Sequence, residues 1–432
     1  MFPRHYPPTA FLLTGFAWLV VSSILGLAIL IGLIRGTPLP QWVRLVHVHA
    51  ALVGGVAQMV LGGFLAFIPP LLMTGHTQRD SHPLLFATIN AGAVGMLTGF
   101  WLHQYVVVGV AGFLVVGAFL WIARDAWTQA RRSLNSPPLN LWYYAAALLS
   151  LFAGLAAGES MGLGLMQQSY GYVRLAHIHL NLLGFVTLAI VGTMHNLLPT
   201  VLDTSLSSPR LGRIVLVLLP LGVAVLIGGF LNSSVLIEMA AGAILFAGAL
   251  LYAVNLFKTW MASAHKGSAA SDHLLIGTFF LLFTIVLGVL VAANSLTTPP
   301  KMPYGTLHLV AYSHMALIGF VLNTIMGALS HLIPITLAVR RVPSNKKRGA
   351  YLNHLTAIMD RWRTVQIGGL SLGTMGLGLL ASLTWNVPLS SPYIQVTMWV
   401  CFALLLSSLT VFSVKLAAVL GKRPEDSTQS ST

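Results

Sequence analysis

The segment RLVHVHAALVG, residues 44–54, decides the fold because it occurs three times along the chain. Its second copy is RLAHIHLNLLG at 174–184, and its third copy is LVAYSHMALIG at 309–319. Each copy places a glycine five residues and a proline twenty residues after its last histidine: Gly54 and Pro69, Gly184 and Pro199, Gly319 and Pro334. Self-similarity of this kind indicates a repeated structural unit. The sequence therefore predicts three copies of one arrangement of helices.

Long apolar runs contain the three segments. A transmembrane helix needs roughly 20 mostly apolar residues, and the alternating strands of a barrel do not give runs of that length. Twelve runs are long enough, at 10–34, 44–72, 84–102, 104–124, 141–166, 174–200, 211–231, 233–257, 273–296, 306–337, 364–385 and 394–418. The repeated segments lie at the start of runs 2, 6 and 10. We therefore expect an all-α polytopic membrane protein, with its twelve transmembrane helices in three pseudo-threefold four-helix repeats.

The composition excludes a soluble domain. Of the 432 residues, 56% are hydrophobic and 7% are charged, whereas soluble globular chains carry about 25% charged residues. We expect a single transmembrane domain over 1–432, with the repeats at about 10–124, 141–257 and 273–418. The single cysteine, Cys401, excludes a disulfide framework, a cysteine-based zinc site and a covalently attached haem.

Positive charge is distributed unevenly between the two sides of the predicted bundle. Twelve spans place both termini on one side, and the other side keeps four of the 23 Lys and Arg residues: Arg35, Arg44, Arg174 and Lys301. Because cytoplasmic loops retain Lys and Arg, we expect a multi-pass protein of the cell inner membrane with both termini in the cytoplasm. The net charge of +14 then reflects topology and attraction to anionic membrane lipid, and no nucleic-acid partner is expected.

Five histidines near the outer ends of these spans form the candidate site. Polar side chains at membrane depth are costly and usually functional, so we expect His49, His179 and His314 to ligate a metal or a haem. His47 and His177 are candidate ligands too. A His-x-His pair on a helix directs its two rings about 200° apart, toward separate pockets. The alternative is that these are buried histidines hydrogen-bonded to neighbouring carbonyl groups.

Three side chains beside the histidines are further candidates. His308 lies six residues before His314, at the outer surface, where it is either solvated, a metal ligand or a partner of a haem propionate. Arg44 and Arg174 each precede a His-x-His pair by three residues. They are either interfacial arginines that extend to water or partners of haem propionates, because a guanidinium binds a carboxylate through two donors.

Two acidic residues fall within the predicted spans. Glu159 lies in the outer half of run 5, in the segment AGESMG, and Glu238 lies in run 8. Ionisable residues inside a membrane often form proton relays. We take Glu159 as the candidate catalytic acid because it is near the predicted histidine site, and Glu238 as a second acid without a local motif.

These features resemble subunit I of the haem–copper oxidase superfamily. The shared features are twelve spans, pseudo-threefold symmetry and outer-leaflet histidines on spans 2, 6 and 10. The stretch that begins at His47 and ends at Gly54, followed by Pro69, is similar to that family's tenth helix. There, a His-x-His pair holds a low-spin haem on one side and a high-spin haem on the other. The length and the His-x-His segments are also similar to the NnrS family of haem- and copper-containing proteins linked to nitric oxide.

The resemblance implies one or two haem b groups. By the family's pairing of spans 2 and 10, a low-spin haem is expected between His49 and His314. A second haem or metal is expected between spans 2 and 6, held by His179 together with His47 or His177. Span 7 has no histidine where the oxidases carry an adjacent pair for copper, so the resemblance favours haem and leaves copper open.

Three functions are consistent with these expectations. The first is a haem-dependent oxidoreductase that reduces O2 or NO, with a quinol or a separate cytochrome or other redox subunit as electron donor. The second is an NnrS-like haem- and copper-binding protein that responds to nitric oxide without turnover. The third is a membrane transporter, because internal repeats and buried polar groups also suit alternating access.

Overall fold

The computed structural model describes residues 7–74, 82–134, 136–294, 296, 311–383 and 387–424. Within these residues every regular element is a helix and none is a strand, which confirms the all-α prediction. Eleven of the described helices are long and apolar enough to cross a membrane. The predicted run 364–385 corresponds to α15 (Arg363–Leu383), which is about 30 Å long at 1.5 Å per residue and matches a bilayer core. The chain is therefore a polytopic membrane protein.

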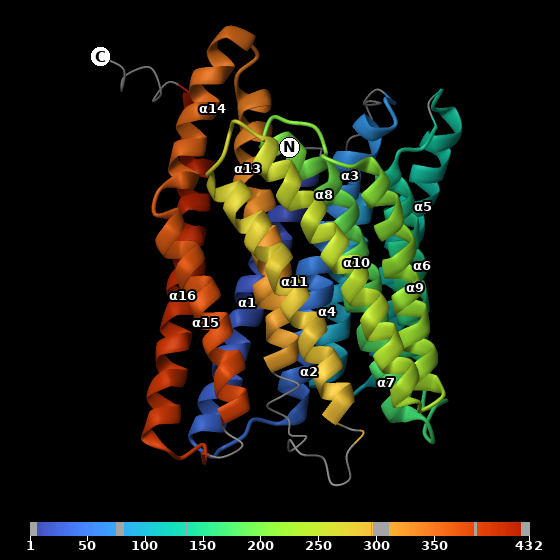
Figure 1. Ribbon diagram of the computed structural model, residues 1–432. Helices are drawn as coiled ribbons and strands as arrows, with labels where there is room; N and C mark the ends of the chain where they lie inside the picture. The colour runs from blue at the N-terminus through green and yellow to red at the C-terminus, as the bar shows by residue number, and fades with distance from the viewer. Residues whose placement is uncertain are drawn as a thin grey trace. The chain divides into compact units, whose positions relative to one another are not determined.

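The remaining α-helices are labelled in Figure 1, and three π-helical segments, η1, η2 and η3, lie between them. In the first half of the chain they are α1 (Pro8–Ile34), α2 (Gln41–His49), η1 (Ala50–Ala57), α3 (Gln58–Leu71), α4 (Pro83–Trp101), α5 (Tyr105–Arg132), α6 (Leu139–Gly162), α7 (Tyr170–His179), η2 (Leu180–Val186) and α8 (Thr187–Val201). In the second half they are α9 (Pro209–Leu231), α10 (Val235–Ala262), α11 (Ala269–Asn294), η3 (Met315–Leu322), α13 (Asn323–Arg341), α14 (Asn345–Asp360) and α16 (Pro392–Gly421).

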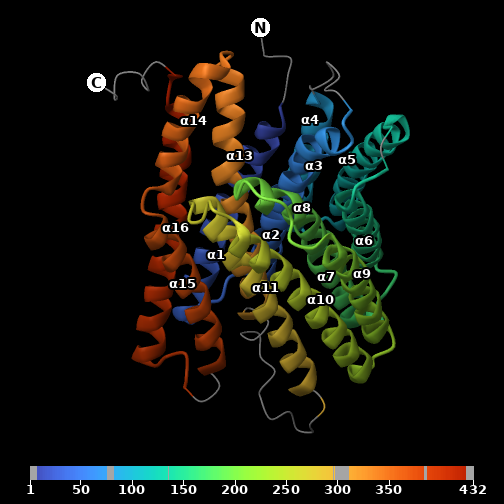
Figure 2. The ribbon, with the colours of Figure 1, turned by 45° about the horizontal axis from the view of Figure 1, so that its top comes forward.

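The chain forms two compact units. Unit 1 comprises Met1–Thr193 and Arg213–Leu245, and unit 2 comprises Met194–Gly212 and Phe246–Thr432. In unit 1, α1 packs along η1 and α3, and α4 packs along α5. In unit 2, α11 packs along η3 and α13, and α15 lies beside α16 (Figures 1 and 2). In both units the first helix of a repeat thus packs against the histidine-bearing span that follows it.

The three histidine-bearing spans are the most buried spans of the described chain. In Gln41–Leu71, Tyr170–Val201 and Ala311–Arg341, 67% of the most apolar 18-residue window is buried, compared with 17–39% in the other eight spans. A span that faces lipid exposes much of its surface, so these three are interior helices. The repeated segments therefore contribute to the interior of the protein rather than to its lipid-facing surface.

The sequence did not predict two of the helical features. The segments η1, η2 and η3 are π-helical, a conformation that is rare and usually limited to single turns. The connection between the tenth and eleventh predicted runs contains α14, a 16-residue helix, which the apolar runs do not predict. Apolar periodicity alone does not reveal a π-turn, because the turn changes the hydrogen-bond spacing without changing the apolar composition.

The glycine of each repeated segment lies where its span crosses the first helix of the same repeat. A Cβ atom at any of these glycines would come within 3.0 Å of a side chain on that helix. The glycines and the residues they face are Gly54 and Trp18, Gly184 and Ser150, and Gly319 and Phe280. The regular spacing of glycine after histidine therefore has a steric cause, because each of the three spans makes the same close helix crossing.

Candidate functional site

His49, His179 and His314 each stand at the N-terminal end of a π-helical segment. His49 immediately precedes η1, His179 precedes η2 and His314 precedes η3. π-Turns inside α-helices are frequently found at functional sites. The three repeats thus share a local distortion of the backbone at the same position relative to histidine, and this marks the histidine segments as the candidate site.

The rings of His49 and His179 are held in the same way. In each ring Nδ1 lies 2.8 Å from the carbonyl oxygen of the residue four positions earlier, Leu45 or Leu175. A carbonyl group can only accept a hydrogen bond, so Nδ1 donates its proton and the neutral ring has its lone pair on Nε2. Histidines that bind metals through Nε2 are commonly oriented by such a bond from Nδ1 to a carbonyl group.

The first histidine of each pair faces the first helix of its own repeat. Nδ1 of His47 lies 2.8 Å from the carbonyl oxygen of Ser22 on α1, and Nδ1 of His177 lies 2.7 Å from that of Gly154 on α6. The proton is again on Nδ1 and the lone pair on Nε2. Hydrogen bonds to carbonyl groups are also expected for histidines with a purely structural role. A ligand histidine differs from a structural one in that its Nε2 binds a metal or a haem iron.

A glycine accommodates the ring at this position in all three repeats. A Cβ atom at this glycine would lie 2.8 Å from the ring in the first two repeats and 3.2 Å in the third. The glycine and ring pairs are Gly26 and His47, Gly158 and His177, and Gly288 and Tyr312. The third repeat therefore keeps the packing of an aromatic ring on a glycine but replaces imidazole by phenol.

An aromatic ring lies against each of the second histidines in unit 1. The ring centroids of His49 and Phe100 are 4.5 Å apart, and those of His179 and Phe230 are 4.8 Å apart. Phe100 lies near the end of α4 and Phe230 near the end of α9, the third helix of each repeat. The two histidines thus have the same apolar neighbour, which keeps water from one side of each imidazole.

One histidine of α2 and one of α7 interact electrostatically within unit 1. The charge of His177 acts on His49, and Figure 1 shows α2 and α7 at the lower end of this unit. In the part of the chain that the structure describes, no three or more His, Cys, Asp or Glu side chains are grouped closely enough to hold a metal ion.

The remaining predicted ligands are placed as follows. Arg44 is exposed and Arg174 is partly exposed, one turn before the histidines, and their contact with haem propionates stays a prediction. His308 lies outside the described residues. His314 belongs to unit 2, and its pairing with His49 stays a prediction.

Glu159 packs against α5. A Cβ atom at Gly109 would lie 2.9 Å from Oε2 of Glu159, and a Cβ atom at Gly112 would meet its Oε1. The preceding residue, Gly158, faces His177 instead, and one residue along a helix corresponds to a rotation of about 100°. The carboxylate and the histidine site therefore occupy different sides of α6, and the catalytic role of Glu159 stays a prediction.

Two buried polar features were missed by the sequence analysis. Gln58, the first residue of α3, has no exposed surface, and its Nε2 and Oε1 have no hydrogen-bond partner among the described residues. An unbonded buried amide costs about 1–3 kcal/mol. The second feature is a hydrogen-bonded group around His273 in unit 2. Gln58 and His273 could have been found in the sequence in the same way. Each is a polar residue inside an apolar run, at a position that the repeated histidine motif does not explain.

Comparison with known proteins identifies one relative and no family. No protein-family model matches the chain. A protein of Aquifex aeolicus (strain VF5), described as "Uncharacterized protein", is 30% identical over 207 residues, which are 46% of this chain and 50% of that protein. The chain thus spans about half the length of this relative. The relative's description gives no activity, so the function has to be inferred from the histidine site.

Proposed function

We propose that the chain is a haem-b-binding membrane protein that transfers electrons and reduces O2 or NO. The observation that supports this proposal most directly is the matched geometry of His49 and His179. In both, Nδ1 is 2.8 Å from a carbonyl oxygen of the same helix, a π-helical segment follows at once, and a phenylalanine ring lies alongside. Two repeats thus present Nε2 as a potential ligand in the same setting.

The residues of unit 1 fit a haem. A six-coordinate haem takes two imidazoles and an apolar surface for its flat macrocycle, and the site supplies both. Because the charge of His177 acts on His49, these two imidazoles would hold one haem. His47 and His179 are then ligands for a second haem or a copper ion. When bound, haem supplies a one-electron iron couple whose potential depends on the axial ligands and on the surrounding hydrogen bonds.

The chain itself orients and shields the ligands. The bonds from Nδ1 to carbonyl oxygens fix each ring and increase the basicity of Nε2. Phe100 and Phe230 exclude water from one side of the histidine rings. Arg44 and Arg174 lie one turn away, and we assign them to haem propionates at the outer surface, since guanidinium and carboxylate groups form two parallel hydrogen bonds.

We also propose how the chain is oriented in the membrane and which partners supply its electrons. The concentration of Lys and Arg on one side supports an inner-membrane protein with both termini in the cytoplasm. The histidine segments then lie near the outer surface. Electrons would come from a membrane quinol or from a separate cytochrome or other redox subunit, and O2 or NO would be the molecule that is reduced.

The test is optical spectroscopy of the full chain, purified after expression with ample haem. We expect sharp b-type bands in the reduced-minus-oxidised spectrum and a matching pyridine haemochrome. His49→Ala should remove most of the low-spin signal, because an axial imidazole is lost. His265→Ala is the matched control, since His265 is an exposed histidine of unit 2, and it should leave the spectrum unchanged.

Addition of CO to the reduced protein separates the possible functions. A CO-induced shift indicates an open haem face and supports reduction of a gas. Bound haem without a CO shift supports electron transfer or an NnrS-like role without turnover. A protein that folds but shows no Soret band contradicts the haem proposal and leaves metal binding or transport as the function of the repeated histidines.

A further inference from the structure

A chain of buried polar side chains crosses the interior of unit 2. It consists of His273 on α11, Asn323 on α13, Gln366 on α15 and Lys415 on α16, which are 0%, 0%, 1% and 6% exposed. His273, Gln366 and Lys415 lie within about two turns of a helix end. Buried ionisable residues are costly in a membrane protein and usually functional, so this group requires an explanation of its own.

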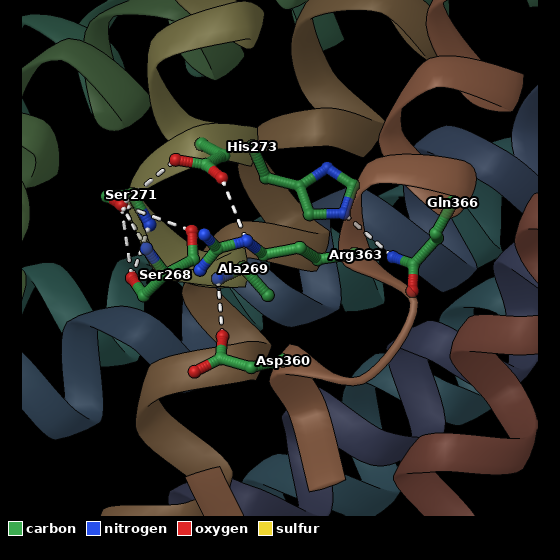
Figure 3. Close-up of polar contacts among 8 residues, drawn as sticks. Ser268, Ala269, Ser271, His273, Asp360, Arg363 and Gln366 are labelled. Carbon is green, nitrogen blue, oxygen red and sulfur yellow. Dashed lines mark hydrogen bonds and ion pairs between the residues drawn. The ribbon is translucent and has the colours of Figure 1, made fainter. Parts of the chain in front are cut away.

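The hydrogen bonds of this group run in one direction. Nζ of Lys415 donates to Oε1 of Gln366 at 2.7 Å, and Nε2 of Gln366 donates to Nε2 of His273 at 2.7 Å (Figure 3 shows the second bond). An ammonium group has donors only, which fixes the orientation of the amide. Because Nε2 of His273 accepts, its ring proton is on Nδ1, which donates to Oδ1 of Asn323 at 2.8 Å. His273 is therefore neutral while Lys415 is charged.

The chain ends at a π-helical segment. Nδ2 of Asn323 donates to the carbonyl oxygen of Gly319, in η3, at 2.7 Å. Every donor along the path from Lys415 to Gly319 points the same way, so a change at one end alters the acceptor available at the next. The backbone that follows His314 is thereby connected to the charge state of Lys415.

The amide oxygen of Gln366 can accept a hydrogen bond from only one cation at a time, either Lys415 or a protonated His273. Protonation of His273 would put an N–H group on its Nε2, facing the N–H group of Gln366. The amide would then have to rotate by about 180°, presenting Oε1 to His273 and its N–H group to Lys415. Lys415 could accept that bond only as a neutral amine, since only the amine has a lone pair. The geometry thus disfavours two positive charges.

Few charged groups act on this site. Within the described part of the chain, the Lys415 side chain makes one hydrogen bond, to Gln366, and Asp360 on α14 is the carboxylate whose charge acts on it. Asp272 on α11 is paired with Arg363 on α15 at 3.4 Å. The packed elements also carry other titratable or charged side chains: His331, Arg340 and Arg341 on α13, and Lys346, Lys347, Arg348, Tyr351 and His354 on α14. Of these groups, Asp360 is the one whose charge acts on Lys415.

A polar pocket brings water close to the site. It has a volume of about 180 Å³, enough for about six water molecules. Its polar lining includes Ser268, Ser330, His331, Asn353 and Asp360. Oδ1 of Asp360 accepts a hydrogen bond from the backbone N–H of Ala269 at 2.6 Å, one turn before His273 (Figure 3). The pocket therefore reaches the N-terminal end of α11, one helical turn from His273.

We propose that Lys415, Gln366 and His273 form a binding site for a single proton. In one state Lys415 is an ammonium and His273 is neutral. In the other, Lys415 has released a proton to water, His273 has taken one from water, and the amide of Gln366 has rotated. Both states contain the same number of protons and carry one positive charge. The ligand is H⁺, and the site does not depend on the proposed haem.

The test measures the protonation of His273 in the full chain in lipid vesicles. Solid-state NMR of protein with ¹⁵N-labelled histidine distinguishes neutral from protonated rings, and the signal missing in His273→Gln identifies His273. In the wild type at neutral pH the ring of His273 should be neutral, with its proton on Nδ1. Lys415→Met should move its protonation midpoint upward by one pH unit or more, because the competing charge is gone and Gln366 is free to rotate.

Further variants test whether a shift of the His273 protonation midpoint comes from this site or from any loss of positive charge. Lys258→Met removes an exposed lysine of unit 2 and should not move the midpoint. Lys415→Gln keeps a donor to Gln366 without the charge and serves if Lys415→Met does not fold. An unchanged or lowered midpoint in both Lys415 variants overturns the proposal. An equal shift in Lys258→Met also overturns it, since the effect would then not come from this site.

Discussion

The third repeat, in unit 2, differs from the two repeats that place their histidines in unit 1. All three repeats pack an aromatic ring on a glycine of their first helix, but the ring is His47 or His177 in unit 1 and Tyr312 in unit 2. The packing therefore does not require an imidazole. The feature that distinguishes the two rings of unit 1 is therefore the nitrogen Nε2 of imidazole, which phenol lacks.

The three repeats also differ at a second position. Nine residues after the last histidine, the three repeats have Gln58, Leu188 and Asn323. Asn323 bonds His273 and Gly319, Leu188 is buried, and Gln58 is buried without a bonded partner among the described residues. The helices thus pack with either an apolar or a polar residue at this position. The shared packing therefore does not require the amide groups of Gln58 and Asn323.

The largest effect is expected from giving repeat 2 the ring of repeat 3. His177→Tyr keeps an aromatic ring on Gly158, so the protein should fold, but it removes a proposed axial imidazole. The low-spin b-type band should then be lost, while the secondary structure measured by circular dichroism is unchanged. Tyr312→Phe is the matched control in unit 2 and should leave the band intact. A full low-spin band in His177→Tyr would mean that this histidine is not a ligand.

The next largest effect is expected at the helix crossings that all repeats share. Gly54→Val places a side chain within 3.0 Å of Trp18, and such overpacking should lower the free energy of unfolding by about 3 kcal/mol. Gly319→Val, which faces Phe280, should behave alike. Thermal unfolding in detergent measures both.

A matched glycine on the same span tests the steric explanation. At Gly63 on α3 an added Cβ would meet only Phe67, at 3.9 Å. Gly63→Ala should therefore leave the stability unchanged or raise it by about 0.5–1 kcal/mol, because alanine favours helix. Equal destabilisation at Gly54 and Gly63 would show that the close helix crossing at Gly54 does not determine the effect.

The sequence predicts the helices well and the site only in part. Apolar runs above 20 residues predict spans directly, because the bilayer dictates their length, and the spacing of glycine and histidine predicts three equivalent crossings. The π-segments after His49, His179 and His314 could not be predicted, because they depend on the hydrogen-bond register. Gln366 and Lys415 appear as isolated polar residues in separate runs, and only packing of α15 and α16 with α11 reveals their connection to His273.

Opposite changes in stability are expected at the position that differs between the units. Gln58→Leu, which introduces the residue type of repeat 2, removes an unbonded amide and should raise the free energy of unfolding of the haem-free protein by about 1 kcal/mol. Asn323→Leu leaves Nδ1 of His273 without its acceptor and should lower it by about 1–3 kcal/mol. Chemical unfolding of each variant beside the wild type measures both. A loss of stability in Gln58→Leu would show that Gln58 has a bound partner, such as water.

The smallest effect is expected at the ion pair beside the buried chain of unit 2. Asp272 and Arg363 are 3.4 Å apart and each is 32% exposed, so water screens their attraction, and such pairs contribute about 1 kcal/mol or less. Asp272→Asn should therefore lower stability by less than about 1 kcal/mol, and raising the salt concentration should reduce the difference further. If Asp272→Asn instead destabilises as strongly as Asn323→Leu, the pair is part of the buried network. Charge balance at Lys415 then depends on Asp272 as well as on Asp360.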